Sequence, residues 1–280
     1  MGPTWRSLRD GTRARLPQQE VAWLVERASG LTAAEQAAAL DAVADERQAE
    51  TFVALVERRA AGEPLQYVLG SWGFRTLDLM VDRRVLIPRP ETEVVAGLAI
   101  DALADRSGPA RAADLGTGSG AIALSLAVEC WPDVEVWATD ASPDALAVAR
   151  ANLAGLGRRA SAVRLLEGSW FAALPDELRG TLDVVVSNPP YVATTDALPA
   201  EVAEWEPPAA LLAGADGLDD LRRIIADGPT WLAPGGTLVV EIGETQGPAV
   251  LDLARTAGFT QTAVHPDLAG KPRALVARGG

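Results

Sequence analysis

A glycine-rich turn between a short apolar strand and an apolar helix constrains the fold of this chain more than any other feature. Residues 112–115 read as a buried strand and residues 121–127 as a helix. Glycines between them let a ligand approach the backbone beside the positive N-terminus of that helix. The spacing is G-x-G-x-G, which fits the G-x-G-x-x-G of dinucleotide sites poorly. The turn consists of Gly116, Thr117, Gly118, Ser119 and Gly120.

An acidic residue ends the next candidate strand. The apolar run 134–139 leads directly into Asp140. In α/β nucleotide-binding folds, an acid at this strand end binds ribose hydroxyls. We therefore expect Asp140 to bind the ribose of the same ligand that the glycine-rich turn holds.

A proline-rich loop follows the candidate strand 182–187. It consists of Asn188, Pro189, Pro190 and Tyr191. Proline has no N–H, and Pro189 keeps Asn188 out of the helical conformation. The loop is therefore stiff and presents carbonyl oxygens and one side-chain amide, with a ring beside them. This predicts a pocket that accepts hydrogen bonds from a planar –NH2 group, whereas a simple turn after a strand is the alternative for this motif alone.

Strands and helices alternate after residue 85, which predicts a mostly parallel, doubly wound sheet. Ligands bind such sheets outside the carboxyl ends of the strands, where all three motifs fall. Ser142 and Pro143 form a helix start, and residues 234–236 predict a turn. The candidate strands are 111–115, 134–139, 162–166, 182–187, 237–242, 259–264 and 273–278.

The first part of the chain is helical. Val21, Leu24, Val25 and Ala28 recur at helical spacing, and a capping box begins at Thr32. The sequence thus divides into three segments. These are a helical bundle over 1–70, which could dock a macromolecular substrate or only add stability, a hairpin linker over 71–85, and the α/β domain over 86–280.

Charge and composition exclude several classes of function. Residues 86–280 hold 14 basic and 26 acidic residues, whereas a duplex nucleic-acid binder needs a basic surface. Cys130 and His265 are the only residues of their kinds, so the chain lacks the material for an internal disulfide, a His/Cys metal cluster or a Ser-His-Asp triad built away from His265. No signal peptide or long apolar run is visible, so we expect a cytoplasmic protein with no metal and no membrane contact.

The sequence resembles the peptide-chain release factor glutamine N5-methyltransferases, weakly over the first 60 residues and strongly afterwards. The resemblance implies a Rossmann-like, class I S-adenosylmethionine-dependent methyltransferase domain with a seven-stranded, mostly parallel sheet and a small N-terminal helical domain. It also implies a substrate, the glutamine of the Gly-Gly-Gln motif in bacterial release factors. The matching stretches are 62–67, 86–93, 114–123, 188–191, 205–207 with 210–211, and 267–273.

The resemblance also assigns residues. Asn188, Pro189, Pro190 and Tyr191 match the catalytic site for the substrate amide, and Asn188 also borders the cofactor. Relatives often have Asp where this chain has Ser169, which leaves the adenine contact there open. Individual roles for Glu91, Thr92 and Glu93 stay open as well. The expected residues for S-adenosylmethionine are Gly116, Thr117, Gly118, Ser119, Gly120, Asp140 and Trp170.

Two other functions are compatible with parts of this sequence. Adenine-N6 DNA methyltransferases and other amino-nitrogen methyltransferases can share the Asn-Pro-Pro-Tyr loop, although the acidic domain counts against a DNA substrate. A non-catalytic binding module could keep the fold, but Asp140 and the intact loop at 188–191 count against decay of the site.

Overall fold

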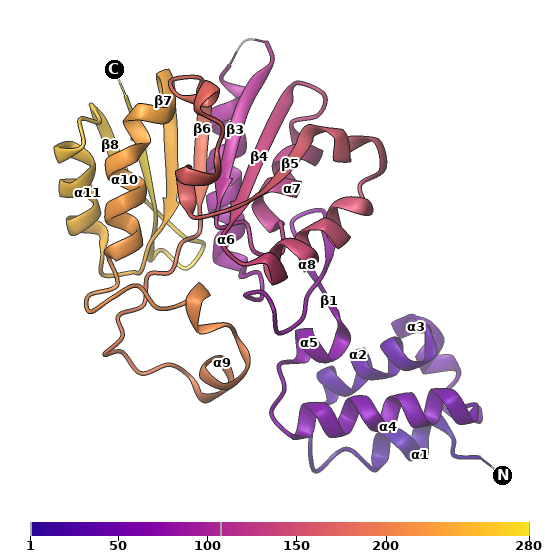
Figure 1. Cartoon of the computed structure of the whole chain (residues 1–280). Coiled ribbons are helices and arrows are strands. Elements are labelled where there is room, and N and C mark those ends of the chain that lie inside the picture. The colour runs from indigo at the N-terminus through magenta and orange to yellow at the C-terminus, as the bar shows by residue number, and fades with distance from the viewer. Residues whose placement is uncertain (1, 107, 280) are drawn as a thin grey trace. The chain divides into compact units, whose positions relative to one another are not determined.

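The computed structural model describes residues 2–106 and 108–279. The chain shown in Figure 1 divides into two compact units. One consists of Met1–Ser71 with Pro199–Trp205, and we call it the helical unit. The other, called the sheet unit, consists of Trp72–Leu198 with Glu206–Gly280.

The helical unit forms where apolar residues recur at helical spacing. Val21 and Leu24 of α2 are buried in one cluster with Phe52 of α4. Gly30 ends α2 in the left-handed region, with a φ of 74°, and the predicted capping box at Thr32 is present. The helices of this unit are α1 (Trp5–Asp10), α2 (Gln18–Ser29), α3 (Ala33–Ala38), α4 (Glu46–Ala60), α5 (Leu65–Leu69) and α9 (Ala200–Trp205).

Helix α9 belongs to the helical unit although it follows β6 in the chain. The guanidinium of Arg59 on α4 donates to Glu20 at 2.7 Å and to Glu201 of α9 at 3.0 Å. Arg59 and Glu20 are only 19% and 18% exposed, so this ion pair is screened less than surface pairs, whereas Glu201 is 47% exposed. The local pattern of residues 199–205 gave no sign of this long-range packing.

The sheet unit contains a seven-stranded sheet in the order β5-β4-β3-β6-β7-β9-β8. Among the described strands of this sheet, β9 runs antiparallel to β7 and β8, and the other six strands run in one direction. The predicted doubly wound, mostly parallel fold is confirmed. The strands are β3 (Ala110–Leu115), β4 (Val134–Asp140), β5 (Val163–Glu167), β6 (Leu182–Ser187), β7 (Leu232–Glu241), β8 (Gln261–Pro266) and β9 (Pro272–Arg278).

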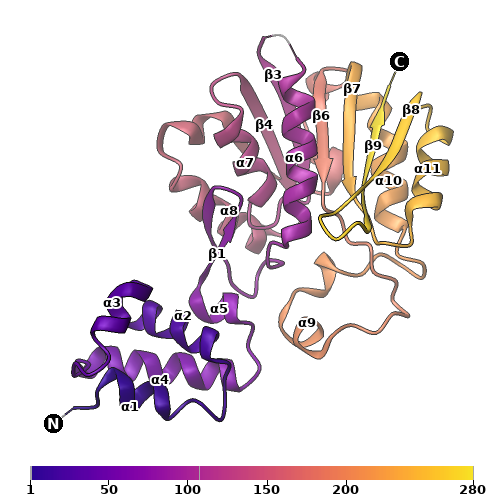
Figure 2. The same cartoon turned by 180° about the vertical axis from the view of Figure 1, so that it is seen from behind.

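Helices cover both faces of the sheet. Figures 1 and 2 show α6 and α7 on one face and α10 and α11 on the other, and each pair contributes to a separate apolar core. Short 3-10 turns lie at 157–162, 170–173, 176–178 and 208–210. The helices are α6 (Pro90–Ala104), α7 (Ala121–Glu129), α8 (Pro143–Ala154), α10 (Asp219–Trp231) and α11 (Gly247–Thr256).

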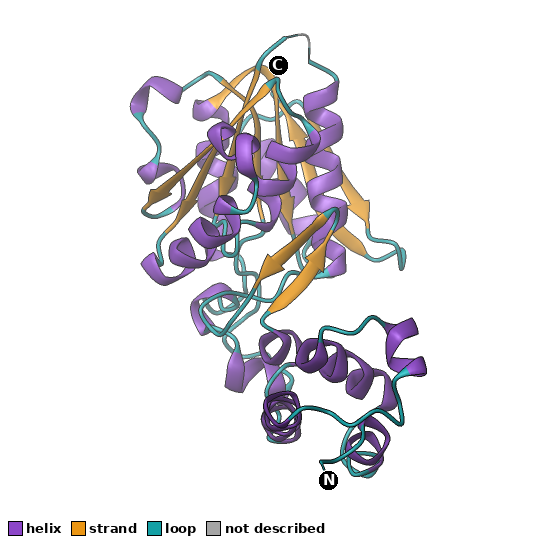
Figure 3. Cartoon of the chain, turned by 90° about the vertical axis from the view of Figure 1, so that its right-hand side faces the viewer, coloured by secondary structure: helices purple, strands orange, loops and turns teal. Residues whose placement is uncertain are grey.

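The predicted hairpin is present as β1 (Ser71–Phe74) and β2 (Leu77–Met80), outside the seven-stranded sheet (Figure 3). The side chain of Asn152 on α8 makes two hydrogen bonds to the backbone of β2. Its amide donates to the Met80 carbonyl at 3.0 Å and accepts from the Met80 N–H at 2.7 Å.

The predicted turn at 234–236 lies inside the bounds of β7. Pairing of β7 with β6 jumps from Leu232 to Thr237, and Gly235 has a φ of 71° between them. Regular pairing therefore begins at Thr237, the residue where the sequence predicts the strand to start.

Asp114, near the end of β3, stabilises the glycine-rich turn through two hydrogen bonds. Its Oδ2 accepts from the Thr117 hydroxyl at 2.7 Å and from the Ala123 N–H at 3.0 Å. Burial raises the pKa of Asp114 to about 7, although both hydrogen bonds oppose the rise. Because both bonds end on one oxygen, a proton on Oδ1 leaves them intact.

The raised pKa of Asp114 makes stability depend on pH. Between about pH 4 and 7 the folded chain holds this proton and the unfolded chain does not, so raising the pH lowers the free energy of unfolding. Asp114→Asn keeps an acceptor for both donors and removes the titration. As the pH rises through this range, we expect the free energy of unfolding of the unsubstituted protein to fall, relative to that of the variant, by at most about 1.4 kcal/mol per pH unit. Urea unfolding at several pH values measures the difference, and parallel curves would contradict it.

Candidate active site

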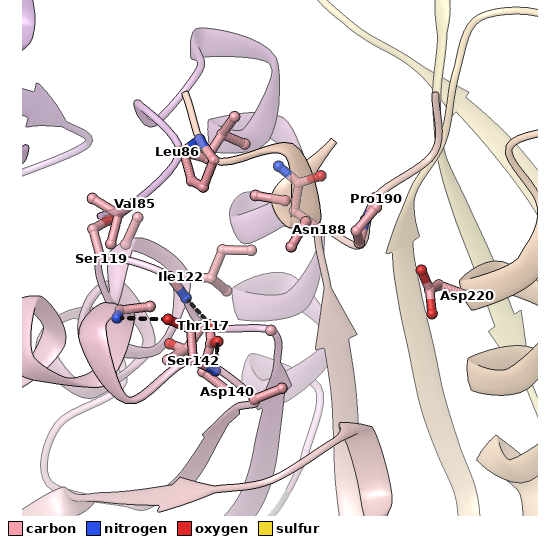
Figure 4. A pocket seen from close by; sticks show the side chains of 18 of the residues that line it. Val85, Leu86, Thr117, Ser119, Ile122, Asp140, Ser142, Asn188, Pro190 and Asp220 are labelled. Carbon is pink, nitrogen blue, oxygen red and sulfur yellow. Dashed lines mark hydrogen bonds between the residues drawn. The ribbon is translucent and has the colours of Figure 1, made fainter. Parts of the chain in front are cut away.

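A cavity of about 370 Å³ lies at the carboxyl ends of β3, β4 and β6. This volume is within the roughly 300–1,000 Å³ of small-molecule sites. Figure 4 shows Asp140 on one side of the cavity and Asn188 with Pro190 on the other. The predicted site residues that line it are Gly116, Thr117, Gly118, Ser119, Asp140, Trp170, Asn188 and Pro190.

The glycine-rich turn bends in the left-handed region. Gly116 has a φ of 74°, and a Cβ there would lie 2.9 Å from the Trp170 ring. Both the backbone and the neighbouring ring therefore require glycine at this position. Gly120 does not line the cavity but begins α7 with a φ of 88°. Residues 116–119 of the turn therefore line the cavity, and Gly120 caps the N-terminus of α7.

Asp140 is bound to the glycine-rich turn. Its Oδ2 accepts from the Gly118 N–H at 2.9 Å, and its Oδ1 accepts from the Ser142 N–H at 2.8 Å. Burial raises the pKa of Asp140, and the two backbone bonds oppose that rise. Each carboxylate oxygen keeps a free lone pair, so Asp140 can accept from further donors such as ribose hydroxyls.

Trp170 forms one wall of the cavity and is held by a residue that the sequence did not single out. Its backbone is left-handed, with a φ of 49°, and its indole N–H donates to Asp220 Oδ1 at 3.1 Å. Burial raises the pKa of Asp220. Ser169, Asp220 and Arg223 also line the cavity. Acidic residues in the first turn of a helix are common, so nothing local distinguished Asp220.

The loop 188–191 is fixed by contacts on both sides. Ser187 donates its hydroxyl to the Leu115 carbonyl at 2.6 Å, and the Asn188 amide donates to the Thr92 hydroxyl at 3.1 Å. Pro189 is buried and lies outside the lining of the cavity. Tyr191 also lies outside it, packed against the apolar core, and donates its hydroxyl to Glu241 at 3.2 Å.

The proline-rich segment before α6 closes part of the cavity. Leu86 and Pro88 line it, together with Pro207, Ala209 and Ala210 of the segment after α9. These two segments are joined by Glu206, which is 4% exposed. Its carboxylate accepts from the Ile87 N–H at 3.2 Å and from the Arg89 guanidinium. The pairing spans 119 residues of sequence, so local patterns gave no role to Glu206.

Residues 91–93, which follow Pro90 in the first turn of α6, have different surroundings. Thr92 is buried and lines the cavity. Glu93 instead accepts from the Arg75 N–H of the hairpin at 2.9 Å. Only Thr92 of the three residues 91–93 therefore reaches the cavity.

The described residues contain no group of three or more His, Cys, Asp or Glu that could hold a metal ion. In that same part of the chain, none of the helices is long and apolar enough to cross a membrane.

Comparison with known proteins assigns the chain to a family. The PrmC N-terminal domain model matches residues 11–70, and the methyltransferase small domain model matches residues 96–204. Release factor glutamine methyltransferase of Xylella fastidiosa is 47% identical over 230 residues, 82% of this chain and 81% of the relative. The protein of that name from Moorella thermoacetica is 44% identical over 284 residues, 99% of this chain and 96% of the relative.

A solved structure supports the fold. A methyltransferase from Pyrococcus furiosus, 19% identical, matches with a TM-score of 0.52 over 74% of this chain and 90% of that chain. The relatives above identify this chain as a member of the release factor glutamine methyltransferase family, and its glycine-rich turn and the residues Asn188 and Pro190 line one cavity.

Proposed function

We propose that this chain transfers a methyl group from S-adenosylmethionine to the side-chain amide nitrogen of a glutamine in bacterial peptide chain release factors. The target is the glutamine of the Gly-Gly-Gln motif, and the other product is S-adenosylhomocysteine. One observation carries the proposal: the glycine-rich turn, Asp140 and Asn188 line a single cavity in a chain that shares 44% identity with a named relative over 99% of its length. We place the activity in the cytoplasm, with translation termination.

The cofactor side of the cavity fits S-adenosylmethionine. Gly116 leaves room beside the Trp170 ring that any side chain would fill, and Asp140 has free lone pairs for ribose hydroxyls. The ring of Trp170 offers an apolar face for the adenine. When bound, S-adenosylmethionine supplies an electrophilic methyl group on a positively charged sulfur.

The acceptor side must overcome the poor nucleophilicity of an amide. The lone pair of a carboxamide nitrogen is delocalised into its carbonyl group. Asn188 Oδ1 accepts one substrate N–H, and a backbone carbonyl of Pro189 or Pro190 accepts the other, so the nitrogen is oriented and its electron density raised. Positioning of this kind supplies most of the rate in our proposal. The nitrogen forms a bond to the methyl carbon while the bond between that carbon and the sulfur breaks, the positively charged sulfur becomes the neutral thioether of S-adenosylhomocysteine, and one amide proton is released to water.

A DNA adenine methyltransferase is the main alternative that shares the loop. The acidic balance of residues 86–280 and the family relationship both favour a protein substrate. Incubating the chain with labelled S-adenosylmethionine and either purified release factor or duplex DNA separates the two. Label on the glutamine peptide supports the proposal, and label on DNA alone refutes it.

Asp140→Ala should weaken cofactor binding. Hydrogen bonds to a charged carboxylate are worth about 1.5–3 kcal/mol each, so losing the ribose contacts should raise the Kd for S-adenosylmethionine at least tenfold. Asp144→Ala, an exposed acid in the first turn of α8, is the matched control and should bind normally. Isothermal titration calorimetry measures both. Equal affinities in the parent and in folded Asp140→Ala would remove the ribose assignment.

Asn188→Ala should abolish most methyl transfer, leave the fold intact and reduce cofactor binding only modestly. Losing one placed hydrogen bond in a transition state costs roughly a hundredfold or more in kcat. Turnover on release factor and calorimetry on S-adenosylmethionine are measured on the same sample. Near-normal turnover would contradict the role of Asn188 as acceptor of the substrate amide.

We also propose that the helical unit docks the release factor. The amide site alone cannot select one loop of one protein, because any surface glutamine offers the same group. Residues 1–85 carry 11 basic and 12 acidic residues, a balance suited to a mixed protein interface. Val43 and Val53 add exposed apolar side chains to the helical unit, at 49% and 47% exposure.

A chain that begins at Gly70 should separate docking from chemistry. We expect it to methylate a short Gly-Gly-Gln peptide as the full chain does, and to methylate intact release factor with a strongly raised KM. The peptide controls for damage to the sheet unit, since residues 199–205 lose their packing partners in this variant. Equal KM values on the intact factor would mean that the helical unit only adds stability.

A further inference from the structure

A chain of hydrogen bonds runs from the cavity into the interior of the sheet unit. The Asn188 amide nitrogen donates to Thr92 Oγ1 at 3.1 Å, and Thr92 Oγ1 donates to Glu241 Oε2 at 2.7 Å. Tyr191 donates its hydroxyl to Glu241 Oε1 at 3.2 Å. The loop after β6 and the end of β7 meet because Ser187 of β6 pairs with Val240 of β7, and the Thr92 bond joins α6 to them. We call these four side chains the Asn188 network.

Thr92 has a single hydroxyl proton, and this determines the direction of its hydrogen bonds with Asn188 and Glu241. A hydroxyl carries one proton, and an ionised carboxylate only accepts. Since Thr92 gives its proton to Glu241, only its lone pairs remain for Asn188. Asn188 must therefore turn its –NH2 group to Thr92. In Figure 4 the nitrogen of this amide lies on the side of Leu86 and its oxygen on the side of Pro190.

We propose that Thr92 and Glu241 are positioning residues that orient the Asn188 amide so that its oxygen faces the acceptor nitrogen of the substrate. This inference rests on the proposed methyl transfer and deepens it. The opposite orientation would set an –NH2 group against the N–H groups of the substrate, and no acceptor would remain at that point. The family comparison names the reaction, whereas the contacts at Thr92 and Glu241 explain how one end of the asparagine is selected.

The burial of Glu241 supports a functional role. Its side chain is fully buried, and an apolar residue there would avoid the cost of desolvating a carboxylate. Burial raises the pKa of Glu241 to about 7, while the Thr92 bond and the positive charge of Arg273 oppose the rise. Tyr191 also donates to it, and Glu91 adds a repulsive charge. These neighbours come from α6, β9 and the loop after β6.

Protonation of Glu241 changes the direction of its hydrogen bond with Thr92. A protonated Glu241 can donate to Thr92, which frees the Thr92 proton to point at Asn188, and the amide can then turn. The ionised form is the productive one, so kcat should fall as the pH falls through about 7. Glu241→Gln cannot titrate and, like the protonated acid, offers only one acceptor to Thr92 and Tyr191. This variant should lower kcat at every pH and should lack the fall with pH.

The first test compares variants of Thr92. Thr92→Val keeps the shape and removes the hydroxyl, and should lower kcat roughly tenfold to a hundredfold with an unchanged Kd for S-adenosylmethionine. Thr92→Ser restores the hydroxyl and should restore most of kcat. Thr139→Val is the matched control, because Thr139 is also buried and its hydroxyl has no partner among the described residues. An unchanged kcat in Thr92→Val would overturn the proposal.

A double-mutant cycle separates positioning from general damage. If Thr92 acts through Asn188, Thr92→Val should cost nothing further in the Asn188→Ala background. An equal loss in both backgrounds would show that Thr92 acts elsewhere and would overturn the proposal. The cycle uses whichever acceptor the parent methylates, release factor or DNA, so a failure of the proposed substrate is seen separately in the parent.

A direct measurement does not depend on activity. Asn152 and Asn188 are the only asparagines in the sequence, so selective ¹⁵N-asparagine labelling gives two side-chain –NH2 signals in an NMR spectrum. The Asn188 signal should shift and exchange faster with solvent in Thr92→Val and should titrate near pH 7 in the parent but not in Glu241→Gln. Asn152, which is bound to Met80 and Ser119, serves as the internal reference. An Asn188 signal that is indifferent to both substitutions would overturn the proposal.

Discussion

The register of four parallel strands is the constraint on which the site depends. Leu115 of β3 pairs with Thr139 of β4 and with Ser187 of β6, and Ser187 pairs with Val240 of β7. One row of the sheet therefore holds the last residue of β3 and of β6 and the last but one of β4 and of β7. The residue that follows this row in each of the four segments belongs to the site or supports it. These residues are Gly116, Asp140, Asn188 and Glu241.

This register explains why much of the site could be predicted from the sequence. A glycine-rich turn, an acid after a strand and an Asn-Pro-Pro-Tyr loop are each local features, and a parallel sheet brings strand ends to one edge. The seven-stranded fold and the capping box at Thr32 follow from patterns of the same local kind. The sequence could also have suggested Glu241, because it is the acidic last residue of an apolar strand just as Asp140 is.

Other residues could not be found in this way, since their roles depend on long-range contacts. Thr92 and Glu241 are 149 positions apart, and Ile87 and Glu206 are 119 apart. Asp220 meets Trp170 only because α10 packs beside the cavity. Periodicity describes which face of an element is buried. It does not identify the polar partner that a buried hydroxyl or indole will find.

The helical unit is built from two segments that lie far apart in the sequence, and this constrains how the protein can evolve. Its helix α9 is encoded well over a hundred residues after the rest of the unit, and the chain passes between the units at 71/72, 198/199 and 205/206. Recombination that exchanged the N-terminal segment alone would supply a partner surface foreign to Glu201 and its neighbours. The two segments of the helical unit are therefore expected to be inherited together, and a change in the packing of this unit would arise by matched substitutions in both segments rather than by exchange of one of them.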